Sequence, residues 1–226
     1  MAQRKFKIAA SLICGDHASI KDDIAVLEKG KVDYLHFDVM DGVFVPRYGL
    51  YPELLKGIKE ITAIPIDVHM MTEEPARYIK EFAEAGADII AVHIEACKHL
   101  HHTLKLIRDA GVKAGVVLNY ATPLSALDYI MDDIDMVELM AINPGIVGHK
   151  LITGTMKKIA DLRKKIDESG KNIFIEIDGG VTPESAPEMV RAGADVLVCG
   201  TSVIYKKEKP LDEKIKELRE LINSKQ

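Results

Sequence analysis

Four side chains have the types and positions expected of one metal site. They are His36 and Asp38 in Leu-His-Phe-Asp-Val-Met-Asp, His69 in Ile-Asp-Val-His-Met-Met, and Asp178 in Ile-Glu-Ile-Asp-Gly-Gly. Each comes at the carboxyl end of a short apolar run that is typical of a buried strand. Two imidazoles and two carboxylates suit one divalent cation, such as zinc, manganese, iron(II) or cobalt. The two carboxylates are also groups that could move a proton.

Each of these residues, taken singly, could instead be a core polar group that its neighbours satisfy. Buried charges are rare, however, unless they are paired or bind a metal. Residues two apart on a strand share a face, so three strands would present polar pairs at the same end. Asp67 and Glu176 lie deeper along their strands and are predicted to be interior partners of the site rather than ligands.

Short apolar runs alternate with helical patterns along the chain. Strands are predicted at Lys7–Ile13, Tyr34–Val39, Ile66–Met70, Ile89–Ile94, Ala114–Leu118, Met136–Ala141, Ile173–Ile177 and Val196–Cys199. Helices are predicted, for example, at Pro75–Ala85, Leu100–Ala110, Leu151–Lys165, Pro183–Ala192 and Leu211–Ile222. Eight strands and eight helices in 226 residues predict an α/β protein with a single (β/α)8 TIM barrel, one catalytic domain over residues 1–226. Ala85-Gly86-Ala87-Asp88 and Ala192-Gly193-Ala194-Asp195 form a weak repeat at helix ends.

The composition indicates a folded globular protein with a substantial core, since 47% of residues are apolar and 29% are charged. A net charge of −5 argues against nucleic-acid binding. No run approaches the length of a membrane span, and the first residues lack the features of a signal peptide. Cys14, Cys97 and Cys199 show no metal spacing and are interpreted as reduced thiols. We therefore expect a cytoplasmic protein without a nucleic-acid or membrane partner.

In a closed barrel, Asp38 and Asp178 would end the second and seventh strands, three steps apart through strands one and eight. Their side chains would approach the centre of the mouth, where barrel enzymes keep their chemistry, from widely separated directions. This arrangement suits a reaction with one acid/base group on each face of a planar intermediate.

Two glycine turns follow the last two predicted strands, at Asp178-Gly179-Gly180 and at Gly200-Thr201-Ser202. Turns at these positions commonly hold phosphate in barrels, although ordinary turn chemistry is the alternative. After the sixth strand, residues 143–150 carry two glycines around small apolar side chains, which is typical of a lid or of a plain connecting loop. Methionines gather near the strand ends, as core filler or as an apolar wall that excludes water; they are Met40, Met70, Met71 and Met140.

These segments together resemble the ribulose-phosphate 3-epimerase family over essentially the whole chain. The matching segments are Ala10–Leu12, His36–Pro46, Asp67–Met71, Val92–Glu95, Asn143–Gly145 and Glu176–Gly180. The Asp-Val-Met-Asp-Gly-Val-Phe-Val-Pro run that begins at Asp38 is the most specific of them.

The resemblance implies a metal-dependent epimerase of the pentose phosphate pathway that interconverts D-ribulose 5-phosphate and D-xylulose 5-phosphate through an enediolate. It implies that His36, Asp38, His69 and Asp178 hold one divalent cation, and that Asp38 and Asp178 are the acid/base pair. Residues implied to contact the sugar phosphate are Ser11, His69, Met40, Met71, Met140, Gly145, Ile146, Val147, Gly148, Gly179, Gly180, Gly200 and Thr201. Members of the family commonly form dimers or hexamers, so a homo-oligomer is expected.

Two loops depart from the family pattern. Arg47 stands where the family usually has Asn, and the lid reads Ile146-Val147-Gly148-His149 after Pro144-Gly145. Arg47 is therefore either a specificity residue or a solvated loop residue. These changes leave open another ketose phosphate, such as D-allulose 6-phosphate.

Two classes other than epimerase remain for comparison. A barrel decarboxylase of the Asp-x-Lys-x-x-Asp type would need a Lys at the position of Met40. A non-catalytic phosphate-binding barrel would not need the complete set of ligands and carboxylates.

Overall fold

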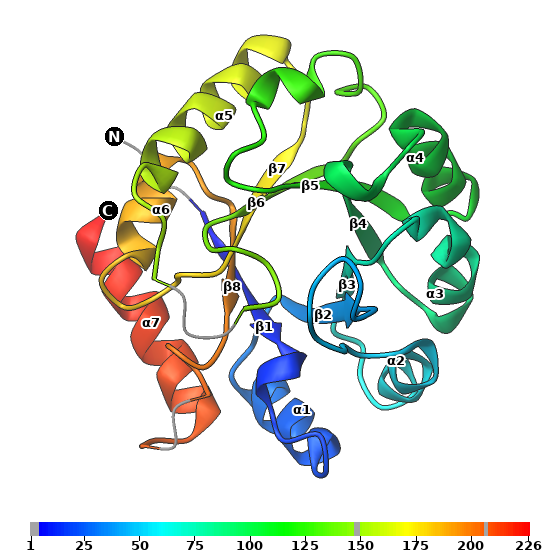
Figure 1. The fold of residues 1–226 in the computed structure, drawn as a ribbon. Helices are drawn as coiled ribbons and strands as arrows, with labels where there is room; N and C mark the ends of the chain where they lie inside the picture. Colours follow the sequence, from blue (N-terminus) through cyan, green and yellow to red (C-terminus); the bar gives the residue numbers. More distant parts are fainter. Residues whose placement is uncertain (1–4, 147–149, 206–207) are drawn as a thin grey trace.

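The computed structural model describes residues 5–146, 150–205 and 208–226 and contains a closed barrel of eight parallel strands. The strands are β1 Lys7–Ser11, β2 Tyr34–Met40, β3 Ile66–Met71, β4 Ile89–His93, β5 Lys113–Leu118, β6 Met136–Met140, β7 Phe174–Asp178 and β8 Val196–Cys199. Each strand pairs with its neighbours in chain order, and β8 pairs with β1 to close the sheet. Figure 1 looks along the barrel into this ring of strands.

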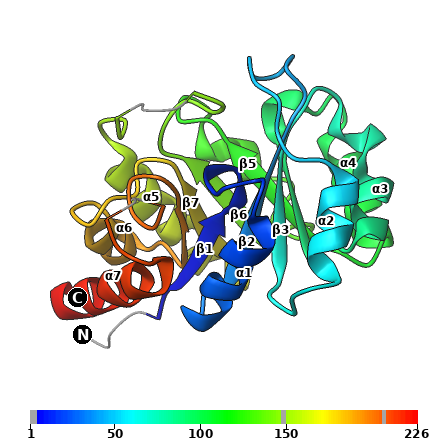
Figure 2. The same ribbon diagram turned by 90° about the horizontal axis from the view of Figure 1, so that it is seen from below.

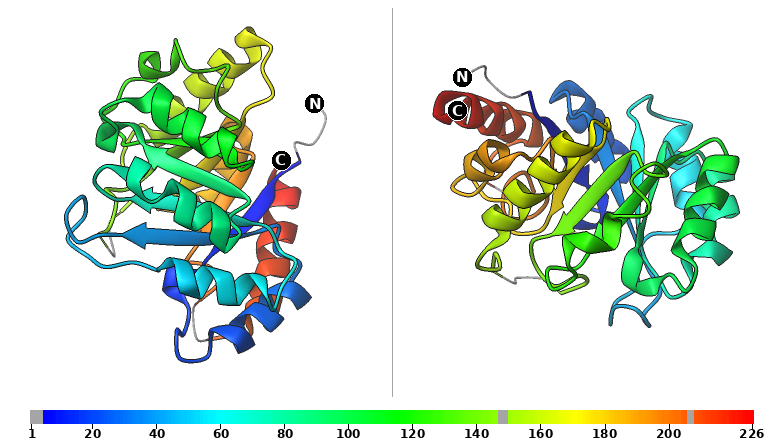
Figure 3. Two further views of the ribbon diagram at one scale, coloured as in Figure 1. Left: turned by 90° about the vertical axis from the view of Figure 1, so that its right-hand side faces the viewer. Right: turned by 90° about the horizontal axis from the view of Figure 1, so that it is seen from above.

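Helices surround the strands as an outer layer, which both views of Figure 3 show. They are α1 Ile20–Lys29, α2 Pro52–Lys59, α3 Ile79–Ala85, α4 Leu100–Asp109, α5 Thr155–Ser169, α6 Ala186–Ala192 and α7 Leu211–Lys225. Short 3-10 helices, η1 Leu12–Cys14, η2 Pro75–Arg77, η3 Ile94–Ala96 and η4 Leu124–Leu127, lie in the connections. Among the described residues, no helix is long and apolar enough to cross a membrane.

Alternation along the strands separates an outer apolar face from a partly polar interior. On β2, Leu35, Phe37 and Val39 belong to the large buried cluster between strands and helices, while His36 and Asp38 point into the barrel. The strands are buried on both faces, which is why they read as nearly continuous apolar runs interrupted by a few charged residues. Those interruptions therefore mark the barrel interior.

The main architecture agrees with the sequence prediction, and the differences are local. The β5–β6 connection contains η4 and no α-helix in the described chain, so the expected count of eight helices was wrong by this one. α5 begins at Thr155 rather than Leu151, because Ile152 N–H donates to Ala141 O beside β6. α6 begins at Ala186 rather than Pro183, because the Thr182 hydroxyl accepts the N–H of Glu184 and of Ser185 and forms a turn.

Four aspartates share one structural role at the amino-terminal end of the barrel. Each directly precedes an even-numbered strand, and its carboxylate accepts a backbone N–H from the start of the preceding odd-numbered strand. The pairs are Asp33 with Ile8 (2.8 Å), Asp88 with Ile66 (2.8 Å), Asp135 with Ala114 (2.9 Å) and Asp195 with Ile175 (2.8 Å). The aspartates that end the two segments of the weak sequence repeat, Asp88 and Asp195, therefore each link a pair of neighbouring strands.

We expect Asp135→Ala to lower the free energy of unfolding by about 1–3 kcal/mol, because the Ala114 N–H loses a charged acceptor inside the fold. Urea denaturation monitored by circular dichroism measures this change. Asp161→Ala is the matched control, since the Asp161 carboxylate forms an exposed ion pair with Lys157 one helical turn away. Equal stability losses in the two variants would contradict this role for Asp135.

Candidate active site

The carboxyl ends of β2, β3 and β7 bring four predicted ligands together inside the barrel. One ligand atom from each of His36, Asp38, His69 and Asp178 lies within 4.8 Å of all the others. His36 Nε2 is 3.5 Å from Asp38 Oδ1, and His69 Nδ1 is 3.7 Å from Asp38 Oδ1 and 3.8 Å from Asp178 Oδ2. Ligands about 2.0–2.2 Å from one ion at tetrahedral angles lie roughly 3.4 Å apart. The spacing therefore fits a divalent cation.

The nitrogen atoms of this cluster support the same conclusion. His36 and His69 are fully buried, and among the described residues His36 Nε2 and His69 Nδ1 have no hydrogen-bond partner. Buried polar atoms are rarely left unsatisfied. Two unsatisfied imidazole nitrogens facing two carboxylates form a donor set that suits a cation such as zinc, manganese, iron(II) or cobalt.

Asp67 and Glu176 lie in the barrel interior, as expected from their positions along β3 and β7. Asp67 Oδ1 is 2.7 Å from His36 Nδ1, and Glu176 Oε1 is 3.9 Å from the same nitrogen. A carboxylate at the far nitrogen of a ligand histidine fixes the ring and increases its basicity. The three residues also form a second group close enough to share a cation.

Sequence reasoning assigned no role to three further interior or mouth residues. Glu138 is fully buried on β6, with Oε1 3.0 Å from His69 Nδ1. His93 ends β4, and its Nε2 lies 2.9 Å from His69 Nε2. Glu95, two residues later, has its Oε2 3.2 Å from His93 Nδ1. The alternation of side chains along a strand could have identified two of them. Glu138 shares a face with Met140 on β6, and His93 lies at the carboxyl end of β4, as His69 lies near the carboxyl end of β3.

The electrostatics of the site are dominated by burial. Burial raises the pKa of Asp178 to about 7, although His36 lowers it; the carboxylates of Asp38 and Asp67 raise it further. Burial lowers the pKa of His36, but Asp67 and Asp38 outweigh this effect and hold the pKa well above its usual value. Burial, with His93 and His36 nearby, holds the pKa of His69 well below its usual value. A neutral His69 is the form that can donate a lone pair to a metal.

A cavity of about 620 Å³ opens above the ligand cluster at the mouth of the barrel. Its lining includes both proposed acid/base residues, Asp38 and Asp178, and the specificity candidate Arg47. The lining also contains these expected contact residues: Ser11, Met40, Met71, Met140, Gly145, Ile146, Gly179, Gly180, Gly200 and Thr201. Val147 and Gly148, with His149, lie outside the described residues. His69 does not line this cavity because its ring is fully buried, which places it in the ligand cluster.

The methionines divide between the two faces of the sheet. Met40 and Met71 pack with Val45 at the mouth, and Met140 lines the cavity. Met70 does not share this wall, because strand alternation turns it outward into the core between strands and helices. The apolar wall therefore consists of Met40, Met71 and Met140.

The turn after β7 requires glycine for steric reasons. Gly179 has φ of +87°, and a Cβ there would lie 2.3 Å from Ile142 Cγ1. Gly180 also has positive φ, and both residues line the cavity together with Gly200 from the turn after β8. This geometry keeps backbone accessible to the cavity at the position expected for a phosphate.

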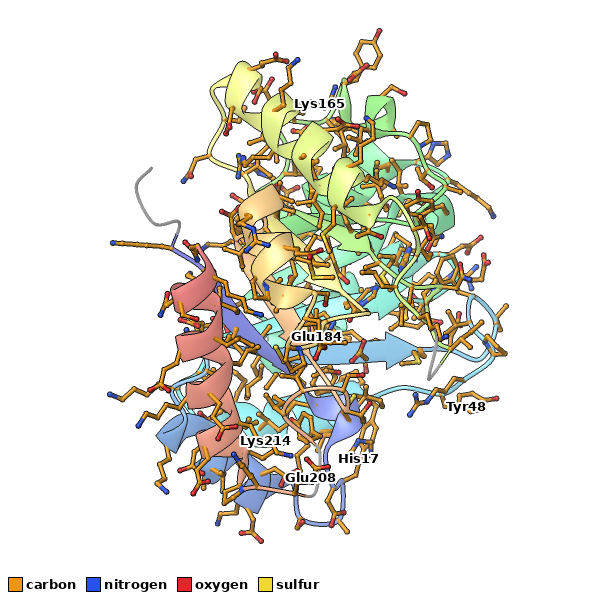
Figure 4. All side chains as sticks on the ribbon, turned by 90° about the vertical axis from the view of Figure 1, so that its left-hand side faces the viewer. His17, Tyr48, Lys165, Glu184, Glu208 and Lys214 are labelled. Atoms are coloured by element: carbon orange, nitrogen blue, oxygen red, sulfur yellow. The ribbon has the colours of Figure 1, made fainter. Side chains whose placement is uncertain are left out.

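The loop between β2 and α2 extends away from the barrel (Figure 2). Asp41 anchors it, because its carboxylate accepts the N–H groups of Val43, Phe44 and, across from the β3 loop, Glu73. Tyr48 on this loop points into solvent (Figure 4) and is 80% exposed. Arg47, next to it, is half-buried and lines the cavity.

Comparison with known proteins shows the family to which the chain belongs. The model of the ribulose-phosphate 3 epimerase family matches residues 7–204. The chain is 48% identical over 198 residues to ribulose-phosphate 3-epimerase of Bacillus subtilis (strain 168), covering 87% of this chain and 91% of the relative. It is 44% identical over 210 residues to ribulose-phosphate 3-epimerase of Escherichia coli (strain K12), covering 90% and 93%.

Solved structures share the barrel at much lower sequence identity. KGPDC from Streptococcus mutans superposes with a TM-score of 0.70 at 13% identity, covering 98% of this chain and 99% of that one. Phosphoribosyl anthranilate isomerase from Thermus thermophilus gives a TM-score of 0.68 at 16% identity, covering 97% and 99%. At these identities the similarity concerns the fold alone.

We expect the affinity for a divalent cation to increase as pH rises through about 7. Asp178, with its pKa raised to about 7, must lose a proton before it can bind a cation, and the raised pKa of His36 acts in the same direction. Calorimetric titration of the metal-free protein with Mn²⁺ between pH 6 and pH 8 measures this dependence. Asp178→Asn should show a shallower dependence, and a pH-independent affinity in the wild-type protein would contradict the expectation.

Proposed function

We propose that this chain, which belongs to the ribulose-phosphate 3-epimerase family, is an isomerase that interconverts D-ribulose 5-phosphate and D-xylulose 5-phosphate in carbohydrate metabolism. The observation that carries the proposal is the placement of two carboxylates, Asp38 and Asp178, beside two unsatisfied histidine nitrogens at the floor of the mouth cavity. Epimerisation next to a ketone needs a proton removed from one face and returned to the other, and two carboxylates on different strands supply these groups.

The two carboxylates have different surroundings. Ser11 Oγ donates to Asp38 Oδ2 at 2.8 Å and orients that carboxylate toward the cavity. Burial raises the pKa of Asp178 to about 7 in the metal-free protein, so this carboxyl group can take up or release a proton near neutral pH. In one direction Asp38 removes the C3 proton of the ketose and Asp178 donates a proton to the opposite face. In the reverse direction the two residues exchange these roles.

His36, Asp38, His69 and Asp178 would hold one divalent cation. When bound, such a cation stabilises negative charge on the ketone and hydroxyl oxygens of an enediolate as a Lewis acid. The residues of the chain keep the site ready for this charge: Asp67 supports the His36 ring, and the methionine wall of Met40, Met71 and Met140 limits water above it.

The glycine turns at the cavity edge support recognition of the phosphate. Gly179, Gly180 and Gly200 line the cavity, where backbone N–H groups can bind an anion without a Lys or Arg. Phosphate binding away from the reacting carbon supplies binding energy that can be used at the transition state.

Homo-oligomer formation is also part of the proposal. Val43, Tyr48 and Tyr51 are large apolar residues exposed on the loop after β2 and at the start of α2, with exposed fractions of 73%, 80% and 56%. Exposed apolar groups of this kind are typical of interaction surfaces. They support association of the chain with copies of itself, and the family resemblance implies a dimer or a hexamer.

A second candidate substrate follows from Arg47. Its position in the cavity lining adds a positive charge at the mouth, on a different loop from the glycine turns. A longer ketose phosphate, such as D-allulose 6-phosphate, would undergo the same C3 chemistry with a different distal contact.

Asp38→Asn and Asp178→Asn should each reduce turnover on the order of 10²–10⁴-fold, because each removes one of the two proton-transfer groups. Turnover of ribulose 5-phosphate and proton–deuterium exchange at C3, followed by NMR in D₂O, measure the effect, with circular dichroism to verify folding. Near-normal turnover in either variant would refute the two-carboxylate mechanism. A wild-type protein with no exchange on any ketose phosphate would favour a phosphate-binding barrel without catalysis.

Arg47→Asn should change the order in which the enzyme prefers different ketose phosphates, because it removes a cation from the cavity lining. Comparison of kcat/KM for ribulose 5-phosphate and allulose 6-phosphate in the two proteins measures the preference. Arg77→Asn, which alters an arginine ion-paired outside the site, is the matched control. An unchanged order would remove Arg47 from the residues that select substrate.

A further inference from the structure

A chain of hydrogen bonds connects the ligand cluster with the loop that follows β5. His69 Nε2 lies 2.9 Å from His93 Nε2, and His93 Nδ1 lies 3.2 Å from Glu95 Oε2. The other oxygen of Glu95 accepts the Asn119 backbone N–H at 2.9 Å and the Thr122 hydroxyl. The proposed proton transfer uses neither His93 nor Glu95, so this series of hydrogen bonds needs another explanation.

The hydrogen bonds that link His69, His93 and Glu95 can leave both imidazole rings neutral in only one donor–acceptor order. Glu95 already accepts two donors, and an ionised carboxylate can only accept, so the proton between Glu95 and His93 belongs to His93 Nδ1. A neutral His93 then has a lone pair on Nε2, and the proton between the rings must belong to His69 Nε2. His69 Nδ1 is consequently unprotonated, and it is the nitrogen that faces Asp38 and Asp178.

Packing keeps the two rings in this arrangement. His93 is fully buried, its ring lies 4.7 Å from the Phe44 ring, and it meets the His69 ring edge to edge, with centroids 5.0 Å apart and an interplanar angle of 29°. Rotation of either ring would break this hydrogen bond between two fully buried side chains. Orientation and tautomer are therefore set together.

The outer end of this hydrogen-bond series, at the loop after β5, is also held in place. Lys158 Nζ donates to the backbone carbonyl oxygens of Asn119 (2.8 Å), Tyr120 (2.9 Å) and Thr122 (2.8 Å). The segment that supplies donors to Glu95 is thus bound from α5 on one side and from Glu95 on the other.

We propose that His93 and Glu95 are positioning residues that hold His69 in the Nε2–H tautomer, so that His69 Nδ1 presents its lone pair to a divalent cation. This inference rests on the proposed cation site. His36 obtains similar support from Asp67 directly, whereas His69 is supported by a carboxylate acting through a second imidazole. In the opposite tautomer, His69 Nδ1 would carry a proton and could not bind a cation.

The tautomers are measurable in the metal-free protein by long-range ¹H–¹⁵N NMR of ¹⁵N-histidine-labelled protein. We expect the Nε2–H form for His69 and the Nδ1–H form for His93. His93→Phe preserves ring volume against Phe44 but removes both hydrogen bonds, so the His69 signal should shift toward the Nδ1–H form. An Nδ1–H signal for His69 in the wild-type protein would overturn the inference.

Cation affinity gives the second readout, by titration with Mn²⁺. We expect His93→Phe to bind Mn²⁺ about 10–100-fold more weakly. His93→Gln, whose amide oxygen can still accept from His69 Nε2–H, should recover most of this loss. Glu95→Gln should give an intermediate loss and mixed tautomers at His93. His102→Gln, on the exposed side of α4, is the matched control and should bind Mn²⁺ normally.

The two readouts separate this inference from the proposed function. A wild-type protein that binds no Mn²⁺ would remove the cation site, while the tautomers in the metal-free protein would still decide the role of His93. Normal Mn²⁺ affinity and an unchanged His69 tautomer in a folded His93→Phe protein would refute the positioning role. If His93→Phe does not fold by circular dichroism, the same comparison is made with Glu95→Gln, and normal values there would refute it equally.

Discussion

The interior of the barrel contains more buried acidic groups than it has permanent cations to pair with them. The carboxylates at this level are Asp38, Asp67, Glu138, Glu176 and Asp178. Removing an ionised carboxylate from water costs several kcal/mol unless a partner compensates it. No lysine or arginine side chain forms an ion pair with these carboxylates among the described residues. Protons, imidazoles and a divalent cation are therefore the means by which this interior can be neutralised.

This constraint connects protonation with cation binding. Burial raises the pKa of Glu138 and Glu176 well above the usual value and that of Asp178 to about 7, so the metal-free interior retains protons. A cation bound by Asp178 would replace one such proton, because the same oxygen atoms would serve both. Asp178, the proposed acid/base residue that also faces the candidate cation site, thus has a pKa near neutral pH in the metal-free protein.

Precise placement then depends on the elements around the charged interior. The aspartates at the amino-terminal end join the strands in pairs, and strand register sets His36 beside Asp67 and Asp38 beside His69. Structures with 13% and 16% identity retain the same barrel, while the side chains at strand ends determine the chemistry. The loop after β2 adds Arg47 to one rim of the cavity, and the glycine turns form another part of it.

The strand order, the inward-facing pairs and the residues of the candidate cation site could be predicted from the sequence alone, because a period of two along apolar strands assigns each side chain to a face. It also placed Asp67 and Glu176 in the interior. The role of His93 and the burial of Glu138 beside His69 depend on distances between strands that local periodicity does not encode. Three further features depend on tertiary packing, because each depends on which neighbour fills the adjacent space. They are the absence of an α-helix from the described residues between β5 and β6, the outward side chain of Met70 and the position of Arg47 in the cavity lining.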